Sequence, residues 1–531
     1  MRTARAGVLA AVLLAACDGE SSMPDAGDAR VPQLDAARTG DAGREDAAAP
    51  EDAGRPPPGW APQPWEDCEG GGRELTAGPS DYRSVLDTLM PGDVLRLEPG
   101  SYDRGLPLRV SGEPGRCIVI EALDPADRPV ILGSDAFNLV AVHGASWIKV
   151  RHLDLDGMGL AGFGVASQGG TDVPTHHVVI EDLHMVGFGA DQQIVGISTK
   201  SPAWDWVIRG NTIEGAGTGL YLGNSDGTQP FVRGVVELNT VLDPRGYCMQ
   251  IKHQIDRSAV PGIPSDAETI IRWNVFAKVN GSSTGGDARP SLLLGHFPLS
   301  GPGASDRYLV YGNFFYDNPT EVLLQAEGNV AAYANVFLNP RGSAIVVQPH
   351  NDVPRAIDLF FNTVVAEGTG IRVSGGDASF AQRVRYNAVF AGTPIAASDA
   401  LGDVTGSRAE ASSIFVDAAS PPGGGLDLHP RAGMLEASVD RDQLPPVLHA
   451  RLDFDERAHG AHAGAYAGPA SGAAVPLALS ARTPEGLGGA RARQSRTYSN
   501  SNGCPLTPFF GGAIQFAILP GSYTGVMSER T

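Results

Sequence analysis

The sequence predicts an all-β protein built as a solenoid, in which short parallel strands stack coil upon coil. A short frame of β-branched and aromatic residues, most often around an Asn, returns nine times between residues 150 and 389, at spacings of 22 to 39 residues. Each interval is too short to bury its own apolar face, so the coils must stack on one another. The 68 Gly and 40 Pro among 531 residues suit the many tight turns that such coils need.

One position of this frame is occupied by Asn in seven of the nine repeats. The nine equivalent residues are Leu153, Leu183, Asn211, Asn239, Asn274, Asn313, Asn335, Asn362 and Asn387. Asn tolerates unusual backbone angles in turns, and stacked Asn amides can hydrogen-bond along a solenoid. We therefore expect these Asn residues to be structural and to lie outside any functional site.

The N-terminus has the pattern of an exported lipoprotein. A basic start, Met1–Arg5, precedes the uncharged apolar run Ala6–Ala16, which is too short to span a bilayer but typical of a signal peptide. The end of this run, Leu14-Ala15-Ala16-Cys17, resembles the lipobox of bacterial lipoproteins. That resemblance implies a signal peptide over residues 1–17, lipidation at Cys17 and anchoring to a bacterial membrane, at the outer membrane or cell surface. An ordinary secretory signal is the alternative, and it also takes the protein out of the cytoplasm.

Composition divides the rest of the chain into three parts. Residues 18–64 are rich in Asp, Ala and Pro and too poor in apolar residues to fold, so they are predicted to be a disordered linker. The solenoid is expected over residues 65–468, and residues 469–531 form a tail that could be disordered or a small cap. The formal net charge of −20 argues against nucleic acid as a partner, although a local cationic cleft could still bind an anionic polymer.

The first predicted coil carries a recognisable motif. Residues 91–102, Pro-Gly-Asp-Val-Leu-Arg-Leu-Glu-Pro-Gly-Ser-Tyr, place an apolar strand between two Pro-Gly turns. This motif resembles the opening coil of right-handed parallel β-helix proteins of the pectin lyase-like fold. Residues 460–466, Gly-Ala-His-Ala-Gly-Ala-Tyr, resemble the ending common after such solenoids. The resemblance implies a right-handed parallel β-helix.

The five cysteines are expected to have different roles. Cys68 and Cys117 flank the first folded segment and could form a disulfide in an oxidising compartment. Cys248 lies within a predicted strand and is expected to be a free structural cysteine.

Four predicted strands place polar side chains on one outward wall. In residues 248–253, alternation sends Met249, Ile251 and His253 inward and Gln250 and Lys252 outward. The same alternation returns in Glu321–Glu327, Ala344–His350 and Gly370–Val373. Stacking in register would form one polar strip containing Lys252, Glu327, His350 and Arg372.

The two longest coils support this wall as a binding surface. Their additional residues fall around Arg257–Ser265, Asn280–Ala288 and Phe297–Asp306, close after Lys252. A regular solenoid places such insertions as loops on one face, often the binding face.

Residues 251–315 are loosely similar to the chondroitinase B and alginate lyase type of polysaccharide lyase. Lys252 matches the position of the catalytic Lys in that family. The family Arg has no match, because its place falls near Leu294, and the acidic calcium ligands are replaced by Arg245 and Tyr247. We therefore expect no cofactor and no calcium site of that type. The widely separated His residues also lack the spacing of a metal site.

β-Elimination of a uronic acid requires a base, a proton donor and a cation that neutralises the carboxylate. Lys252 is the candidate base, and His296 and His350 are candidate acids. The remaining catalytic candidates are Arg289 as the carboxylate partner, with Arg257 or Arg372 as alternatives, and Glu327. The candidate substrate-binding residues are Gln250, Gln325, Gln348, Asn351 and Arg372.

Other interpretations remain open from the sequence. Lys252 and Glu327 could form a solvated ion pair of little consequence. A hydrolase would need two facing carboxylates, for which Glu327 with Asp287 or Glu321 is the available choice. A lipid-anchored protein that only binds glycans is the non-catalytic alternative. The favoured hypothesis is a monomeric enzyme outside the cytoplasm that cleaves an acidic polysaccharide as a lyase.

Overall fold

The fold is described from a computed structural model that covers residues 68–170, 172–447, 449–470 and 476–481. The predicted signal peptide with Cys17, the predicted linker 18–64 and tail residues 471–475 and 482–531 lie outside the described residues.

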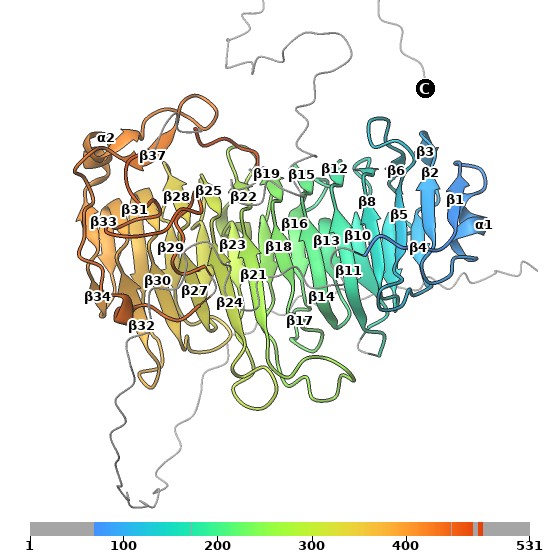
Figure 1. The fold of residues 1–531 in the computed structure, drawn as a ribbon, viewed down its shortest axis with the longest axis horizontal. Coiled ribbons are helices and arrows are strands. Elements are labelled where there is room, and N and C mark those ends of the chain that lie inside the picture. Colours follow the sequence, from blue (N-terminus) through green and yellow to red (C-terminus); the bar gives the residue numbers. More distant parts are fainter. Residues whose placement is uncertain (1–67, 171, 448, 471–475, 482–531) are drawn as a thin grey trace, which may run out of the picture. The chain divides into compact units, whose positions relative to one another are not determined.

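The described residues form a right-handed parallel β-helix with three ladders of strands, which confirms the predicted fold (Figure 1). Every pairing within the ladders is parallel, and from β2 onward the strands follow the order ladder A, ladder B, ladder C. The short strand β17 (Phe231–Val232) is an additional ladder A strand that pairs with β14. Ladder A contains β1 (Glu74–Ala77), β2 (Val94–Leu97), β5 (Ile118–Ala122), β8 (Ile148–Arg151), β11 (Thr175–Glu181), β14 (Ala203–Arg209), β18 (Val235–Glu237), β21 (Glu268–Arg272), β24 (Arg307–Tyr311), β27 (Val330–Tyr333), β30 (Ile357–Phe360), β32 (Gln382–Arg385) and β34 (Ala400–Leu401).

Ladders B and C join where two long strands bend from one ladder into the other. Ladder B contains β3 (Ser101–Tyr102), β6 (Val130–Leu132), β9 (Asp154–Asp156), β12 (His184–Val186), β15 (Thr212–Glu214), β19 (Thr240–Leu242), β22 (Val275–Ala277), β25 (Phe314–Tyr316), β28 (Val336–Asn339), the first parts of β31 (Thr363–Val373) and β33 (Ala388–Ala396), and β35 (Val404–Gly406). Ladder C contains β4 (Leu106–Leu108), β7 (Val140–His143), β10 (Val165–Gln168), β13 (Val195–Thr199), β16 (Thr218–Leu222), β20 (Met249–Ile251), β23 (Leu292–Leu294), β26 (Leu324–Ala326), β29 (Ile345–Val347) and the second parts of β31 and β33.

Alternating side chains from the three ladders fill the interior. In ladder C, Met249, Leu292 and Leu324 occupy one inward row, and each is fully buried. In ladder B, the ring of Phe315 stacks on that of Phe337 with centroids 4.5 Å apart. Because identical positions of successive coils meet, apolar residues at one position of the repeat form a continuous core.

The recurrent Asn residues form the expected hydrogen-bonded ladder between ladders A and B. The side-chain oxygen of Asn313 accepts from the backbone N–H and the side-chain amide of Asn274, at 3.0 and 2.9 Å. Its own amide donates to Asn335 at 2.9 Å. The series runs from Asn211 to Asn387 and ends on the carboxylate of Asp403.

The expectation that these Asn residues adopt the unusual turn conformation is wrong. The residue before the Asn has the positive φ, as in Trp273 (56°), Ala334 (49°) and Phe361 (53°). The Asn instead satisfies the backbone groups of the turn, which is why its side chain recurs while the strained position varies.

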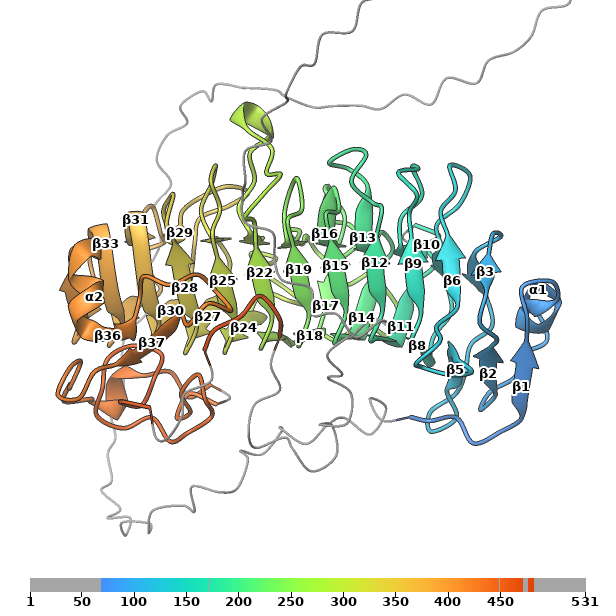
Figure 2. The same ribbon diagram turned by 90° about the horizontal axis from the view of Figure 1, so that it is seen from above.

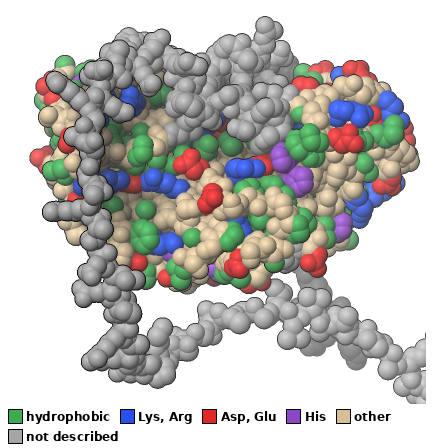
Figure 3. Space-filling view, turned by 60° about the horizontal axis from the view of Figure 1, so that its bottom comes forward, with side chains coloured by type: hydrophobic (Ala, Val, Ile, Leu, Met, Phe, Trp, Pro, Cys, Tyr) green, Lys and Arg blue, Asp and Glu red, His purple; other side chains and the backbone are tan. Residues whose placement is uncertain are grey.

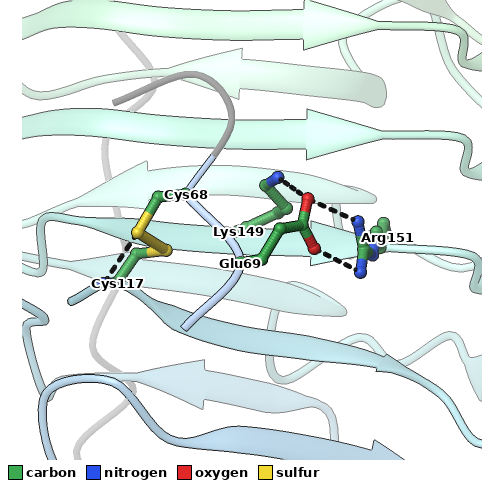
Figure 4. The surroundings of a disulfide bond; sticks show 5 residues. All are labelled: Cys68, Glu69, Cys117, Lys149 and Arg151. Carbon is green, nitrogen blue, oxygen red and sulfur yellow. Dashed lines mark hydrogen bonds and ion pairs between the residues drawn. A yellow bond between two sulfur atoms is a disulfide. The ribbon is translucent and has the colours of Figure 1, made fainter. Parts of the chain in front are cut away.

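The first coil is secured by a short helix, a disulfide and an ion-pair cluster (Figure 4). Helix α1 (Tyr82–Leu86) packs Tyr82 edge-on against Tyr102. Cys68 and Cys117, for which the sequence suggested a disulfide, are bonded in the structure. The neighbouring Glu69 carboxylate accepts from Lys149 Nζ at 2.8 Å and also pairs with Arg151, as Figure 4 shows.

The chain after Gly406 folds back over two of the three ladders (Figure 2). This C-terminal segment contains α2 (Ala411–Ile414) and the antiparallel pair β36 (Phe415–Asp417) and β37 (Asp427–Pro430). It packs on outward side chains of ladder B and ladder A, but neither apolar cluster includes an outward residue of ladder C. Neither of the two short α-helices in the described residues is long and apolar enough to cross a membrane.

Candidate functional site

The outward face of ladder C, termed here the ladder C wall, carries two rows of side chains. The first row follows the strand register, and its members are Ala141, Ala166, Ser198, Tyr221, Gln250, Leu293, Gln325, Val346 and Arg372. Two residues further along each coil, backbone hydrogen bonds extend the register beyond the strand ends. The second row consists of Gln168, Lys200, Gly223, Lys252, Gly295, Glu327 and Gln348.

The wall predicted from the sequence is real, but part of its register was wrong. Gln250, Lys252, Gln325 and Gln348 face outward as expected. Arg372, however, aligns with Val346 in the first row, where its guanidinium donates to Gln348 Oε1 at 2.7 Å. His350 is an exposed turn residue, because β29 ends at Val347.

Glu327 holds a turn together and is not available as an outward catalytic group. Its side chain is only 1% exposed. One carboxylate oxygen accepts from the backbone N–H of His296, and the other accepts from three successive N–H groups, of His350, Asn351 and Asp352, at 3.1, 2.6 and 3.2 Å. The predicted catalytic role of Glu327 is therefore corrected to a structural one. The alternative of a hydrolase, which needed Glu327 as one of two facing carboxylates, is not supported.

His296 is likewise built into the turn. Its Nδ1 lies 2.5 Å from the carbonyl oxygen of Phe297 and its Nε2 lies 2.9 Å from that of Val353, with the side chain 3% exposed. Both ring nitrogens are thus occupied by backbone oxygens, so His296 cannot serve as the acid on the wall.

Two further sequence-based placements are corrected. Arg257, a possible carboxylate partner, is fully buried and forms an ion pair with Asp306, which ties the loop after β20 to the loop after β23. His253 does not point into the core, because β20 ends at Ile251, and it lies half-buried in the following turn.

A group of cations and aromatic rings surrounds Lys252. The Nζ atoms of Lys252 and Lys200 lie 5.4 and 5.0 Å from the ring centroid of Tyr221, and Lys200 is also 5.2 Å from that of Phe163. Within the part of the chain that the structure describes, neither ammonium has an ion-pair partner. Cation–π contacts hold both lysines against the wall without neutralising them.

The environment of Lys252 lowers its pKa. Burial is the largest cause that lowers its pKa, and the positive charges of Arg289 and Lys200 act in the same direction. Arg289 comes from the loop between β22 and β23, where its guanidinium lies 6.0 Å from the ring of Tyr247. Beneath this loop, Lys278 donates to the carbonyl of Arg289 at 2.8 Å, and burial lowers the pKa of Lys278 to about 8.

Two buried polar atoms on the first row have no hydrogen-bond partner among the described residues. They are Oε1 of Gln250, whose side chain is 2% exposed, and Oγ of Ser198. They flank Tyr221 on the two adjacent strands. A buried polar atom without a partner is costly, so the wall beside Tyr221 carries two unsatisfied groups, the acceptor Gln250 Oε1 and the hydroxyl of Ser198.

Lys200 and Tyr221 were missed by the sequence analysis, although a signal was present. The chain has only four lysines among its 40 basic residues, namely Lys149, Lys200, Lys252 and Lys278. Lys149 pairs with Glu69, and the other three lie on or beneath the ladder C wall. In a protein that otherwise uses Arg, lysines concentrated at one surface indicate a role that needs the smaller and more easily deprotonated cation.

Comparisons with known proteins give no family and only distant structural likenesses. No family model matches the chain, and no curated protein sequence matches it significantly. Three solved enzyme structures resemble this chain distantly. A GH136 lacto-N-biosidase from Eubacterium ramulus is 11% identical with a TM-score of 0.43, over 63% of this chain and 68% of that one. The PL6 family alginate lyase AlyGC is 13% identical with a TM-score of 0.39, over 71% and 57%.

Pectate lyase Pel9A is a third such structure, at 12% identity and a TM-score of 0.32, over 78% of this chain and 97% of that one. These distant likenesses carry no argument about activity. The fold rests on the strand pairings, and function must be argued from the ladder C wall.

Proposed function

We propose that this protein binds an acidic polysaccharide along the ladder C wall and cleaves it by β-elimination, with Lys252 as the base. The observation that carries the proposal is the half-buried, unpaired Lys252 beside two further cations, Lys200 and Arg289, in a protein whose net charge is −20. A local cationic surface on an acidic protein favours an anionic ligand, and a lowered pKa favours a base.

The chemistry follows from the groups around Lys252. The neutral amine removes the proton on the carbon next to the carboxylate, and the electron pair forms a C=C bond as the C–O bond to the next sugar breaks. The cation of Arg289 stabilises the negative charge that develops on the carboxylate. The leaving oxygen takes a proton from Tyr221, whose pKa burial raises, so that its phenol stays protonated.

The test measures the ultraviolet absorbance of unsaturated uronates after incubation of the whole protein with alginate, pectate, chondroitin, dermatan and heparin. We expect product with at least one polymer and none with Lys252→Ala. Lys252→Arg is the matched variant, because it keeps the positive charge but cannot act as a base, and it should bind polymer without cleaving it. Undiminished cleavage by Lys252→Arg would contradict the assignment of the base.

Non-catalytic glycan binding is the second candidate, and one observation favours it. Glu327 and His296 are bonded to backbone groups of a turn, so two of the expected catalytic groups are not available on the wall. Tyr221 is then the acid that a lyase would use. Tyr221→Phe distinguishes the two functions. We expect it to lower kcat at least tenfold with little change in affinity if the protein is a lyase, whereas a binding protein shows no turnover in any form.

The lipobox-like sequence extends the proposal to location. We propose that a lipid on Cys17 holds the protein on a bacterial membrane and that residues 18–64 let the solenoid reach polysaccharide outside the cell, as a monomer.

A further inference from the structure

The ladder C wall is hollowed on the N-terminal side of Tyr221. A hollow of about 300 Å³ lies over β10 and β13, with the small side chains of Ala166 and Ser198 as its floor. Phe163 and Asn138 line it from the preceding turns, and Gln168 and Lys200 line it from the second row. Along the first row, the small side chains of Ala166 and Ser198 are followed by the large ring of Tyr221, so the hollow ends at that ring.

The hollow has the groups that an acidic sugar needs. Lys200 Nζ offers a positive charge without an acidic partner among the described residues, and Phe163, over whose ring this ammonium lies, gives the hollow an apolar lining. Ser198 Oγ is buried without a hydrogen-bond partner and lies on the floor. A uronate placed there would give Lys200 a counter-ion.

Lys200 and Lys252 are separated by one coil, whose second-row residue is Gly223. Neighbouring strands are about 4.8 Å apart, so the two lysines stand about 10 Å apart along the solenoid. Gly223 has a φ of 90°, and a side chain there would crowd Lys252. The position between the lysines is therefore kept open above the ring of Tyr221.

We propose that the hollow at Lys200 is a second uronate subsite and that the wall selects an extended chain with carboxylates on alternate sugars directed at Lys200 and Lys252. One sugar of an extended chain covers about one coil, so two sugars cover the interval between the lysines. In a chain with two-fold symmetry, the carboxylates of sugars n and n+2 point to the same side. The intervening sugar lies over Gly223 and Tyr221. This inference rests on the proposed function of the wall.

The test uses the full chain and acidic oligosaccharides of two, three and four sugars from alginate, polygalacturonate and chondroitin. Affinity is measured by calorimetry at pH 5.5, where Lys252 is protonated and turnover is suppressed. For a homo-uronate series, we expect affinity to rise about tenfold between two and three sugars, because only the longer ligand reaches both lysines. Lys200→Gln should abolish this step and leave the affinity for two sugars within about twofold.

Arg431→Gln is the matched control, since Arg431 is an exposed cation on the C-terminal segment. It should preserve the step between two and three sugars. A step of unchanged size in Lys200→Gln would overturn the second subsite while leaving the proposed function intact. Failure of every acidic oligosaccharide to bind the unmodified protein would overturn the proposed function, and this inference with it.

Discussion

At the scale of single residues, the wall shows why lysine and arginine are not interchangeable in this chain. Thirty-six of the 40 basic residues are Arg, and many of them form ion pairs between coils, as Arg209 and Arg272 do on either side of the buried Glu237. Those positions need a permanent charge and a planar, bidentate donor. Lys252 has no such carboxylate among the described residues, and its environment disfavours its charge.

The pH dependence of cleavage should report this environment. A base acts in its neutral form, so kcat/KM should rise with pH and level off with a midpoint below the ordinary Lys pKa of 10.5, since the pKa of Lys252 is lowered. Arg289→Gln removes a positive charge that lowers this pKa, so the midpoint should move to higher pH. Arg372→Gln is the control, because Arg372 does not contribute to the shift. Identical midpoints in all three proteins would show that Lys252 is not the titrating base.

The residues of the wall were only partly predictable. Alternation within short strands placed Gln250 and Lys252 correctly, because side-chain direction depends on strand geometry alone. The positions at which strands end depend on contacts with neighbouring coils. The sequence therefore placed His350 on a strand, although it lies in the turn that follows β29. Roles that arise from turn packing, such as that of Glu327, require coordinates, since a buried carboxylate bound by N–H groups looks the same in sequence as an exposed one.

At the scale of elements, the Asn ladder explains why the fold was predictable. Each buried Asn accepts a hydrogen bond from a backbone N–H of the preceding coil and donates to a backbone carbonyl of that coil, as Asn313 does with Asn274 and Ile271. The repeat must therefore keep this side chain even where strand and loop lengths vary. The ladder begins where the N–H of Leu183 donates to Asn211. It ends at Asp403, whose carboxylate accepts the hydrogen bonds of Asn387 and, in the described part of the chain, has no further coil to donate to. This accounts for Leu at the first two frame positions and for the repeat that fades after Asn387.

Removal of an internal member of the ladder should be costly. Asn313→Ala leaves the buried backbone N–H and side-chain amide of Asn274 without their acceptor, so we expect a loss of about 3 kcal/mol in the free energy of unfolding, measured in urea. Asp403→Asn retains the acceptor oxygen at the end of the ladder and should cost less than about 1 kcal/mol. Asn280→Ala, at an exposed position, should change stability by no more than about 0.5 kcal/mol. Equal losses at positions 313 and 280 would contradict the structural role of the ladder.

At the scale of the described chain, the three ladders differ in how much of their outward face the C-terminal segment covers. It covers part of the outward faces of ladders A and B, and the stacked rings of Tyr311, Tyr333 and Phe360 lie in one of the clusters beneath it. Figure 3 shows one face on which acidic and basic side chains are interspersed, as expected of a surface whose charges pair with one another. Lys200 and Lys252, which have no ion-pair partner among the described residues, lie on ladder C, and the proposed function is placed there for that reason.

Three buried histidines make the attachment of this segment sensitive to pH in two directions. Burial lowers the pKa of His459 to about 4 and that of His449 to about 3. Burial also opposes the charge of His429, but its hydrogen bonds to Asp455 and Asp427 outweigh that effect and raise its pKa above 6.5. At pH 6.5 the folded protein therefore favours the neutral forms of His459 and His449 and the charged form of His429.

Stability should consequently pass through a maximum near pH 6.5. Below that pH, His459 and His449 bind protons in the unfolded chain but not in the folded protein. Each should therefore lower the free energy of unfolding by about 1 kcal/mol between pH 6.5 and 5.5. Above it, the stabilisation from charged His429 is lost as the pH passes the folded pKa of that residue. Thermal unfolding between pH 5 and 8.5 measures both limbs. His429→Gln should remove the decline on the alkaline side. His459→Phe, which preserves stacking on Phe361, should remove about half of the decline on the acid side, because His449 remains. A variant that altered the opposite limb would show that the signs assigned to these histidines are wrong.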